Sequence, residues 1–190
     1  PSHFGALGGS GGALTIFSQR LLTSTDFFSG AFPADYGNAL GGVFDVRFRN
    51  GNTEKRQHSA QLSVLGIDVA TEGPFNKKGN ASYIANYRFS TTTLVEQFLD
   101  LGLLPVFQDL SFKLHFKTKK GGSLNVFGIG GISNSSQVPV QDTARWSEPG
   151  TTNYGFITET VTGTIGTSYV QPINDKTFIK SSLIGTGIQI

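Results

Sequence analysis

Apolar and polar residues alternate without exception between positions 110 and 117, and this pattern restricts the chain more than any other. The apolar set is Leu110, Phe112, Leu114 and Phe116, and the polar set is Ser111, Lys113, His115 and Lys117. Successive side chains of a β-strand point to opposite faces, so the segment predicts a strand with one apolar and one polar face. Between lipid and a wet lumen, Lys113, His115 and Lys117 would line the lumen. In a soluble sandwich they would face solvent, and either arrangement keeps them wet.

Similar segments recur along the chain and predict six antiparallel strands. We expect them at residues 58–71, 81–90, 110–117, 123–133, 156–170 and 176–189. Within residues 81–90, Tyr83 and Tyr87 share the apolar face, and Ile84 is the exception on the polar face. Strands of about 11 to 15 residues exceed the length usual in globular sheets and can cross a bilayer when tilted.

The connections between these strands alternate in length. Short turns at 74–80, 117–122 and 171–176 alternate with longer links near 92–106 and 134–155, and residues 94–99 have the composition of a helical turn. Such alternation is expected when one rim of a barrel carries tight turns and the other carries loops. Near the start of the chain we expect a short strand over 13–17 and a turn over 23–26.

Composition removes several classes of function. Only 15% of residues are charged and the net charge is +2, which argues against a nucleic-acid partner. The chain has no Cys, which excludes disulfides and thiolate metal sites, and it has no apolar run long enough for a membrane-spanning helix. The three histidines lack metal-ligand spacing and no catalytic motif stands out, so we expect no metal, no cofactor and no enzyme. The first residues lack a signal-peptide pattern, so we expect a chain that is cytosolic, already processed or cut from a longer one.

Residues 29–52 carry the most specific motif. They read SGAFPADYGNALGGVFDVRFRNGN, with Phe32, Pro33, Asp35, Tyr36 and Gly37 followed by Gly41, Gly42, Val43 and a short strand. This segment resembles the end of the plug in TonB-dependent outer-membrane receptors of the Bacteroidetes (SusC-like) type. Arg47 to Asn52 is similar to the family's exit from the plug, and Glu72 to Phe75 is similar to the end of its first barrel strand.

The resemblance implies an all-β fold made of a partial plug and about six antiparallel strands of a large, roughly 22-stranded transmembrane β-barrel. Residues 1–52 would be the C-terminal part of the plug domain, and residues 53–190 would be the first strands of an incomplete barrel. On this basis the chain is expected to be an internal fragment of a longer receptor in the bacterial outer membrane.

The function implied by the resemblance is TonB-dependent active uptake of a scarce solute, such as a siderophore, an oligosaccharide or a peptide. TonB, energised with ExbB and ExbD, would act through a segment absent from this chain, and outer-membrane lipids would surround the barrel. A SusD-like lipoprotein is a further partner in this branch, although no residue here requires one.

At the plug–barrel junction the residues of interest are Phe32, Pro33, Asp35, Tyr36, Gly37, Gly41, Asp45, Arg47 and Arg49. The glycines mark backbone that needs positive φ or a close neighbour, or else a hinge for plug movement. Asp35, Asp45, Arg47 and Arg49, with the two arginines foremost, would pair with charges of the barrel wall and hold the plug, or else be solvated at the rim. Trp146, in the loop over 141–150, would contact a ligand or join an interfacial aromatic girdle with Tyr83 and Tyr87.

Two other readings compete with the transporter. A non-transporting β-rich surface or adhesion module would use its loops to bind a glycan or a protein partner. A passive porin is a weaker alternative, because it would not need the plug-like segment from Phe32 to Val46.

Overall fold

The structure is a computed structural model of the 190-residue chain. It describes residues 15–30, 36, 41–63, 66–91, 106–137, 139, 141–145 and 155–190. Two antiparallel sheets account for most of this part, which confirms the all-β prediction. Among the described residues, no helix is long and apolar enough to cross a membrane.

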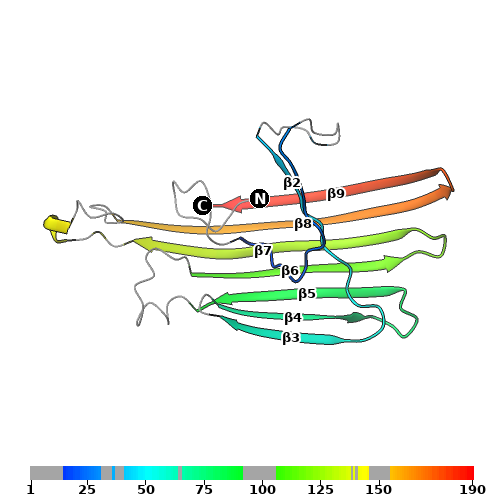
Figure 1. Cartoon of the computed structure of the whole chain (residues 1–190), viewed down its shortest axis with the longest axis horizontal. Helices are drawn as coiled ribbons and strands as arrows, with labels where there is room; N and C mark the ends of the chain where they lie inside the picture. Colours follow the sequence, from blue (N-terminus) through cyan, green and yellow to red (C-terminus); the bar gives the residue numbers. More distant parts are fainter. Residues whose placement is uncertain are drawn as a thin grey trace.

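The main sheet has seven strands in the described part, and each strand pairs with its neighbours in sequence (Figure 1). Its strands are β3 (Gln57–Ser63), β4 (Gly66–Pro74), β5 (Ala81–Ser90), β6 (Val106–Lys117), β7 (Ser123–Gln137), β8 (Phe156–Asn174) and β9 (Thr177–Gln189). A second sheet pairs β1 (Asp26–Phe28) with β2 (Val43–Asp45), and the 3-10 turn η1 (Thr143–Arg145) lies between β7 and β8. The predicted short turns therefore join β4 to β5, β6 to β7 and β8 to β9.

The run at 58–71, predicted as a single strand, is a hairpin of β3 and β4. The Ser63 hydroxyl donates to the carbonyl of Gly66 (3.0 Å) and accepts from its amide (3.2 Å). A Cβ on Gly66 would lie 2.5 Å from the carbonyl oxygen of Phe89, so the return strand needs glycine where it meets β5. The main sheet therefore has one strand more than the six predicted, and its strands vary from 7 residues in β3 to 19 in β8.

The expectations for the start of the chain were also wrong. Thr15 to Phe17, the described part of the strand expected at 13–17, is irregular, and the Phe17 amide donates to the Thr15 hydroxyl (3.2 Å). The turn expected at 23–26 lies earlier, where the Leu21 amide donates to the Ser18 carbonyl (3.1 Å). The helical turn expected at 94–99 lies outside the described residues.

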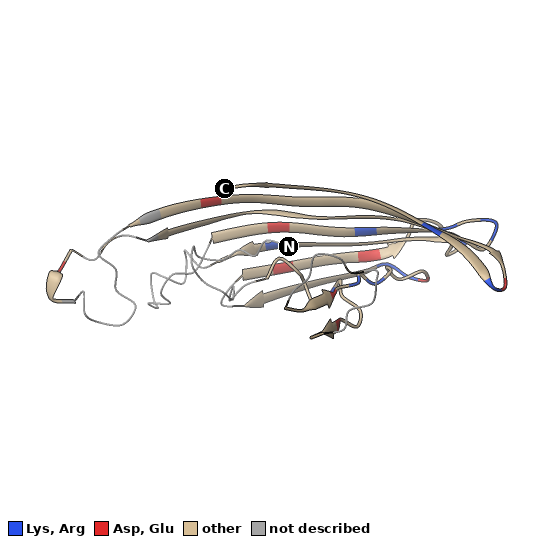
Figure 2. Cartoon of the chain, turned by 90° about the horizontal axis from the view of Figure 1, so that it is seen from above, with Lys and Arg blue, Asp and Glu red and all other residues tan. Residues whose placement is uncertain are grey.

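The register of the sheet separates two faces. Tyr87, Leu110, Gly130, Gly163 and Gly187 form one cross-strand row, and we call the side to which this row belongs the open face. The adjacent row of Asn86, Ser111, Ile129, Thr164 and Thr186 belongs to the opposite side. We call that side the segment face, because residues 15–30 and 41–52, the crossing segment, lie across it. Figure 2 shows the sheet arched along its strands, with the crossing segment on the hollow side.

Burial on the two faces is opposite to that of a sheet in a soluble protein. On the segment face polar residues are buried, among them Ser82, Asn86, Asp109 and Ser111. On the open face Leu110, Ile165 and Leu183 are 50%, 61% and 74% exposed. The cluster of buried apolar residues is small, with Ile16 and Phe107 at its centre and Phe17 and Ile129 packed against it. Over β4 to β6 the sheet thus presents its apolar side outward and encloses its polar side, whereas both faces of β9 are exposed.

Gly51 fixes how closely the crossing segment approaches the sheet. A Cβ there would lie 1.9 Å from the backbone oxygen of Tyr83, whereas a Cβ on Gly185 would meet nothing within 4 Å. We expect Gly51→Ala to lower the free energy of unfolding by about 2 kcal/mol, because backbone on both sides must shift. Gly185→Ala is the matched control and should change it by less than about 0.5 kcal/mol. Thermal unfolding followed by circular dichroism measures both, and equal effects would contradict the proposed approach.

Candidate functional site

The candidate site is the interface between the crossing segment and the segment face of the main sheet. Two passes of the crossing segment are joined by backbone hydrogen bonds, from the Thr23 amide to the Arg47 carbonyl (2.9 Å) and from the Arg49 amide to the Leu21 carbonyl (2.8 Å). Leu21 is fully buried, so this double strand of backbone is anchored from within. Its polar side chains contact β3 and β4, and two of its backbone carbonyls accept hydrogen bonds from β5 and β6.

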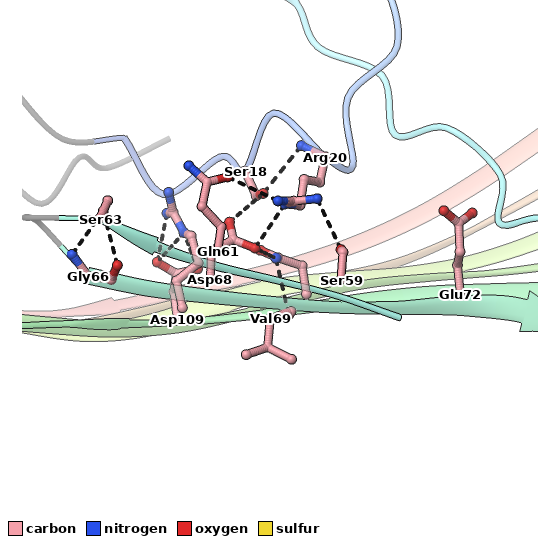
Figure 3. A network of polar contacts seen from close by, with 12 residues as sticks. Ser18, Arg20, Ser59, Gln61, Ser63, Gly66, Asp68, Val69, Glu72 and Asp109 are labelled. Carbon is pink, nitrogen blue, oxygen red and sulfur yellow. Dashed lines mark hydrogen bonds and ion pairs between the residues drawn. The ribbon is translucent and has the colours of Figure 1, made fainter. Parts of the chain in front are cut away.

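Arg20 is the centre of the first cluster of contacts with the sheet (Figure 3). Its guanidinium lies 3.3 Å from the Asp68 carboxylate and donates to the Ser59 hydroxyl and the Gln61 side-chain oxygen, both at 3.0 Å. The Ser18 hydroxyl donates to the other Asp68 oxygen (3.3 Å). The planar guanidinium thus contacts three side chains from β3 and β4, which a lysine amine could not do in the same geometry.

Arg88 and Asp109 form a second cluster beside the first. The Arg88 guanidinium, on β5, donates to both carboxylate oxygens of Asp109 on β6, with a shortest distance of 2.7 Å. The same guanidinium donates to the Thr15 carbonyl of the crossing segment (2.7 Å) and lies over the Phe107 ring. Asp109 is almost fully buried, so removing Arg88 would leave an uncompensated charge.

Arg49 makes the third connection. Its guanidinium donates to both oxygens of Glu72 on β4, at 2.7 and 2.8 Å, and to the Arg20 carbonyl at 2.6 Å. The Asn52 amide donates to Glu72 as well (2.9 Å). The hydrogen bond with Glu72 raises the pKa of Arg49 above its ordinary value. A bidentate pair of this kind fixes orientation as well as attraction.

Arg47 is oriented differently from Arg49, although the sequence offered both as partners of the wall. Its guanidinium pairs with Asp45 inside the crossing segment, with Arg47 Nε 2.9 Å from the carboxylate, and it is well exposed. The hydrogen bond from Arg47 holds the pKa of Asp45 below its usual range, and Asp45 in turn raises the pKa of the Tyr36 hydroxyl. Tyr36, Asp45 and Arg47 therefore form a group of their own.

The expectation that the junction glycines have a positive φ or a close neighbour holds for Gly42 and fails for Gly41. A Cβ on Gly42 would lie 2.9 Å from the Phe27 ring, which is a close approach, whereas Gly41 has open space around it. Gly41 also lacks a positive φ, so neither structural reason given for this residue applies. Phe32, Pro33, Asp35, Gly37 and Trp146 lie outside the described residues.

The predicted row on β6 faces the crossing segment. The Lys113 amine donates to the Phe48 carbonyl (2.6 Å), and Nδ1 of His115 lies 2.8 Å from the side-chain oxygen of Asn125. His115 is buried and Lys117 is exposed at the turn end of the strand. The expectation that all three residues are wet was wrong for His115, because its neighbours cover it.

A cavity of about 460 Å³ lies between the crossing segment and the sheet. Its lining includes Phe17, Arg20, Gln61, Asp68, Arg88 and Phe107. The charges in this lining are compensated in pairs, and aromatic rings adjoin them, so the cavity suits an uncharged or weakly charged polar solute. Within the described ranges, no group of three or more acidic or histidine residues could hold a metal ion.

Sequence reasoning identified Arg49 and Lys113 but missed the acidic partners on the sheet. Asp68 and Glu72 share one face of β4, and Asp109 comes directly before the alternating run of β6. Acidic residues at every second or fourth position of a predicted strand were the available signal.

Comparisons of the chain with protein-family profiles, with curated proteins and with solved structures found no match.

The Arg49–Glu72 pair is expected to hold the crossing segment on the sheet. We expect Glu72→Gln to speed proteolytic cleavage within the crossing segment about tenfold, because the half-buried Arg49 guanidinium loses its anionic partner and one of its two side-chain acceptors. Arg47→Gln removes an exposed pair that does not reach the sheet and should change the rate by less than about twofold. Limited proteolysis followed by mass spectrometry measures both rates. A larger effect at Arg47 than at Glu72 would contradict this assignment.

Proposed function

We propose that the chain is part of a TonB-dependent active transporter of the bacterial outer membrane. In this proposal the main sheet is a section of the wall of a large β-barrel, and the crossing segment is the last part of its plug. The observation that carries the proposal is the inverted burial of the sheet, with apolar side chains exposed on one face and polar side chains enclosed on the other. Lipid outside and a hydrated, plugged lumen inside account for both faces.

The dimensions and side chains of the sheet support a lipid-facing role. Strands β6 to β9 have 12, 15, 19 and 13 residues, and about 9–11 residues of tilted strand cross a bilayer. Near the short turns, the Phe75 ring stacks on Phe116 at 5.7 Å and contacts Tyr83 at 5.2 Å. Tyr87 and Phe89 lie further along the same open face and are exposed. Aromatic bands at two levels are typical of the girdles at both membrane interfaces.

The edges of the sheet support the same proposal. In the described part, β3 and β9 are the outermost strands, and each pairs on one side. Unpaired backbone amides and carbonyls are costly in hydrocarbon, so in a membrane both edges need further strands. We propose that the rest of the barrel supplies them.

A polar interface between plug and wall suits a plug that must move. Hydrogen bonds and ion pairs broken in a wet lumen are replaced by bonds to water, so the net free energy per contact is small. An apolar interface of the same area would expose hydrophobic surface each time it opened. Pulling by TonB would therefore release the Arg20, Arg49 and Arg88 contacts one after another and open a path beside β3 to β6.

The transported solute would be a siderophore, an oligosaccharide or a peptide, captured before TonB acts. The cavity beside Arg20 and Arg88 lies on the route that opens when the crossing segment leaves the sheet. TonB, with ExbB and ExbD, would engage a segment that this sequence does not contain, and a SusD-like lipoprotein would be an additional partner. In this proposal the Gly41–Gly42 pair would be a hinge for plug movement.

Single-cysteine labelling tests the membrane wall directly, because the chain has no Cys. Leu183 belongs to the open face, and Ser182 belongs to the segment face of the same strand. We expect a spin label on Leu183→Cys to be relaxed mainly by oxygen, which concentrates in lipid, and a label on Ser182→Cys mainly by a water-soluble nickel chelate. Electron paramagnetic resonance in native membranes measures both. Relaxation of both spin labels mainly by the nickel chelate would contradict the transporter proposal and favour the surface module.

Energised opening is testable with a second cysteine. Ser111 is 1% exposed on the segment face, its hydroxyl has no hydrogen-bond partner among the described residues, and Ser111→Cys changes its size little. We expect a membrane-impermeant maleimide to label Ser111→Cys several-fold faster in energised cells than in cells treated with a protonophore. Ser182→Cys, which is exposed, should label at the same rate in both. Equal labelling rates of Ser111→Cys in energised and protonophore-treated cells would contradict energised movement of the plug and favour the passive porin.

A further inference from the structure

Lysines gather at one end of the main sheet. The three short turns lie between the strands at residues 75–80, 118–122 and 175–176. They carry Lys77, Lys78, Lys119, Lys120 and Lys176, and all five side chains are exposed. The same turns contain a single acidic residue, Asp175. Figure 2 shows this positive charge at the turn end of the strands. In the part of the chain that the structure describes, none of the five lysines is in an ion pair.

Directly inside these turns, the open face is aromatic and apolar. Phe75 and Tyr169 are 49% and 38% exposed there, and Phe75 stacks on Phe116. A row of free cations above a row of aromatic rings matches the boundary between headgroups and hydrocarbon. The lysines are therefore at the level of lipid phosphates if the open face meets lipid.

Further along the open face lies a depression of about 650 Å³. Leu110, Phe112 and Ile165 contribute to its sides, and Gly128, Gly130, Gly163, Gly185 and Gly187 contribute to its floor. A Cβ at Gly185 or Gly187 would meet nothing within 4 Å, so packing against the described residues does not require glycine at either position. The lining of the hollow is mostly apolar, as an acyl-chain site requires.

The turn lysines and the hollow are separated by the length of a lipid chain. Five residues of β7 lead from Ser123, beside the Lys119–Lys120 turn, to Gly128 at the near end of the hollow. At about 3.4 Å per residue this is roughly 17 Å, close to half the thickness of a bilayer core of about 30 Å. One phospholipid can therefore contact both features at once.

We propose that the open face binds an anionic phospholipid, whose phosphate contacts the lysines of the short turns and whose acyl chain reaches the near end of the glycine-floored hollow. This inference rests on the proposed membrane location of the sheet. The net positive charge of the turns favours a lipid with a net negative headgroup over a zwitterionic one with the same chains. Each lysine near an anionic lipid surface contributes on the order of fivefold in affinity.

Native mass spectrometry of the whole protein purified in detergent tests the proposal, with phosphatidylglycerol and phosphatidylcholine of identical chains as probes. We expect phosphatidylglycerol to be retained at least about fivefold better. Lys119→Gln/Lys120→Gln should remove most of this preference. The matched control, Lys117→Gln/Lys180→Gln, removes two charges from the segment face near the same end and should keep it.

A second variant tests the hollow. Gly185→Leu/Gly187→Leu fills it and should lower retention of both phospholipids several-fold, while soluble glycerol phosphate should not displace the bound lipid. Equal retention of the two lipids, an equal effect of the control pair, or displacement by glycerol phosphate would overturn the inference. A spin label on Leu183→Cys that is relaxed by oxygen, combined with any of these results, would retain the membrane wall and reject only the lipid site.

Discussion

The rest of the structure depends on the burial of a polar sheet face beneath the crossing segment. Arg20 and Arg49 reach from that segment to Asp68 and Glu72, and Arg88 reaches back from the sheet to a backbone carbonyl. These contacts satisfy charges that would otherwise be desolvated without compensation. With the polar side of β3 to β6 engaged in this way, this part of the sheet presents its apolar side to its surroundings. The contrast between the two faces is therefore sharpest beneath the crossing segment.

Alternation in the sequence was sufficient to predict the all-β fold, the two faces of β5 and β6 and the three short turns. It failed at 58–71, where Leu62 and Ile67 have opposite parity in a single strand but lie opposite one another on the open face of the hairpin. The apolar residues change from even to odd positions between Leu62 and Ile67, and this change indicates a turn that the prediction of one long strand did not include. Ile84, an exception in the polar pattern, is fully buried on the segment face.

The site was less predictable than the fold, because it depends on which strands are adjacent. Arg47 and Arg49 are two positions apart and chemically identical, yet only Arg49 contacts the sheet in the described part of the chain. Their different roles arise from the position of Glu72 on β4, across 23 residues of chain. No local pattern contains that information. The resemblance to plug segments indicated where to look, and the register of the sheet supplied the partners.

The simple order of the sheet has a consequence for how the molecule assembles. Every strand of the main sheet pairs with its neighbour in sequence, so each pairing is local along the chain and the strands can pair in turn. The crossing segment is the opposite case, since the contact between Thr15 and Arg88 spans 73 residues. Although this segment precedes the sheet along the chain, its binding surface does not exist until β4, β5 and β6 have paired. The crossing segment therefore stays unbound and hydrated at first, and it docks only after the strands that follow it in the sequence have paired.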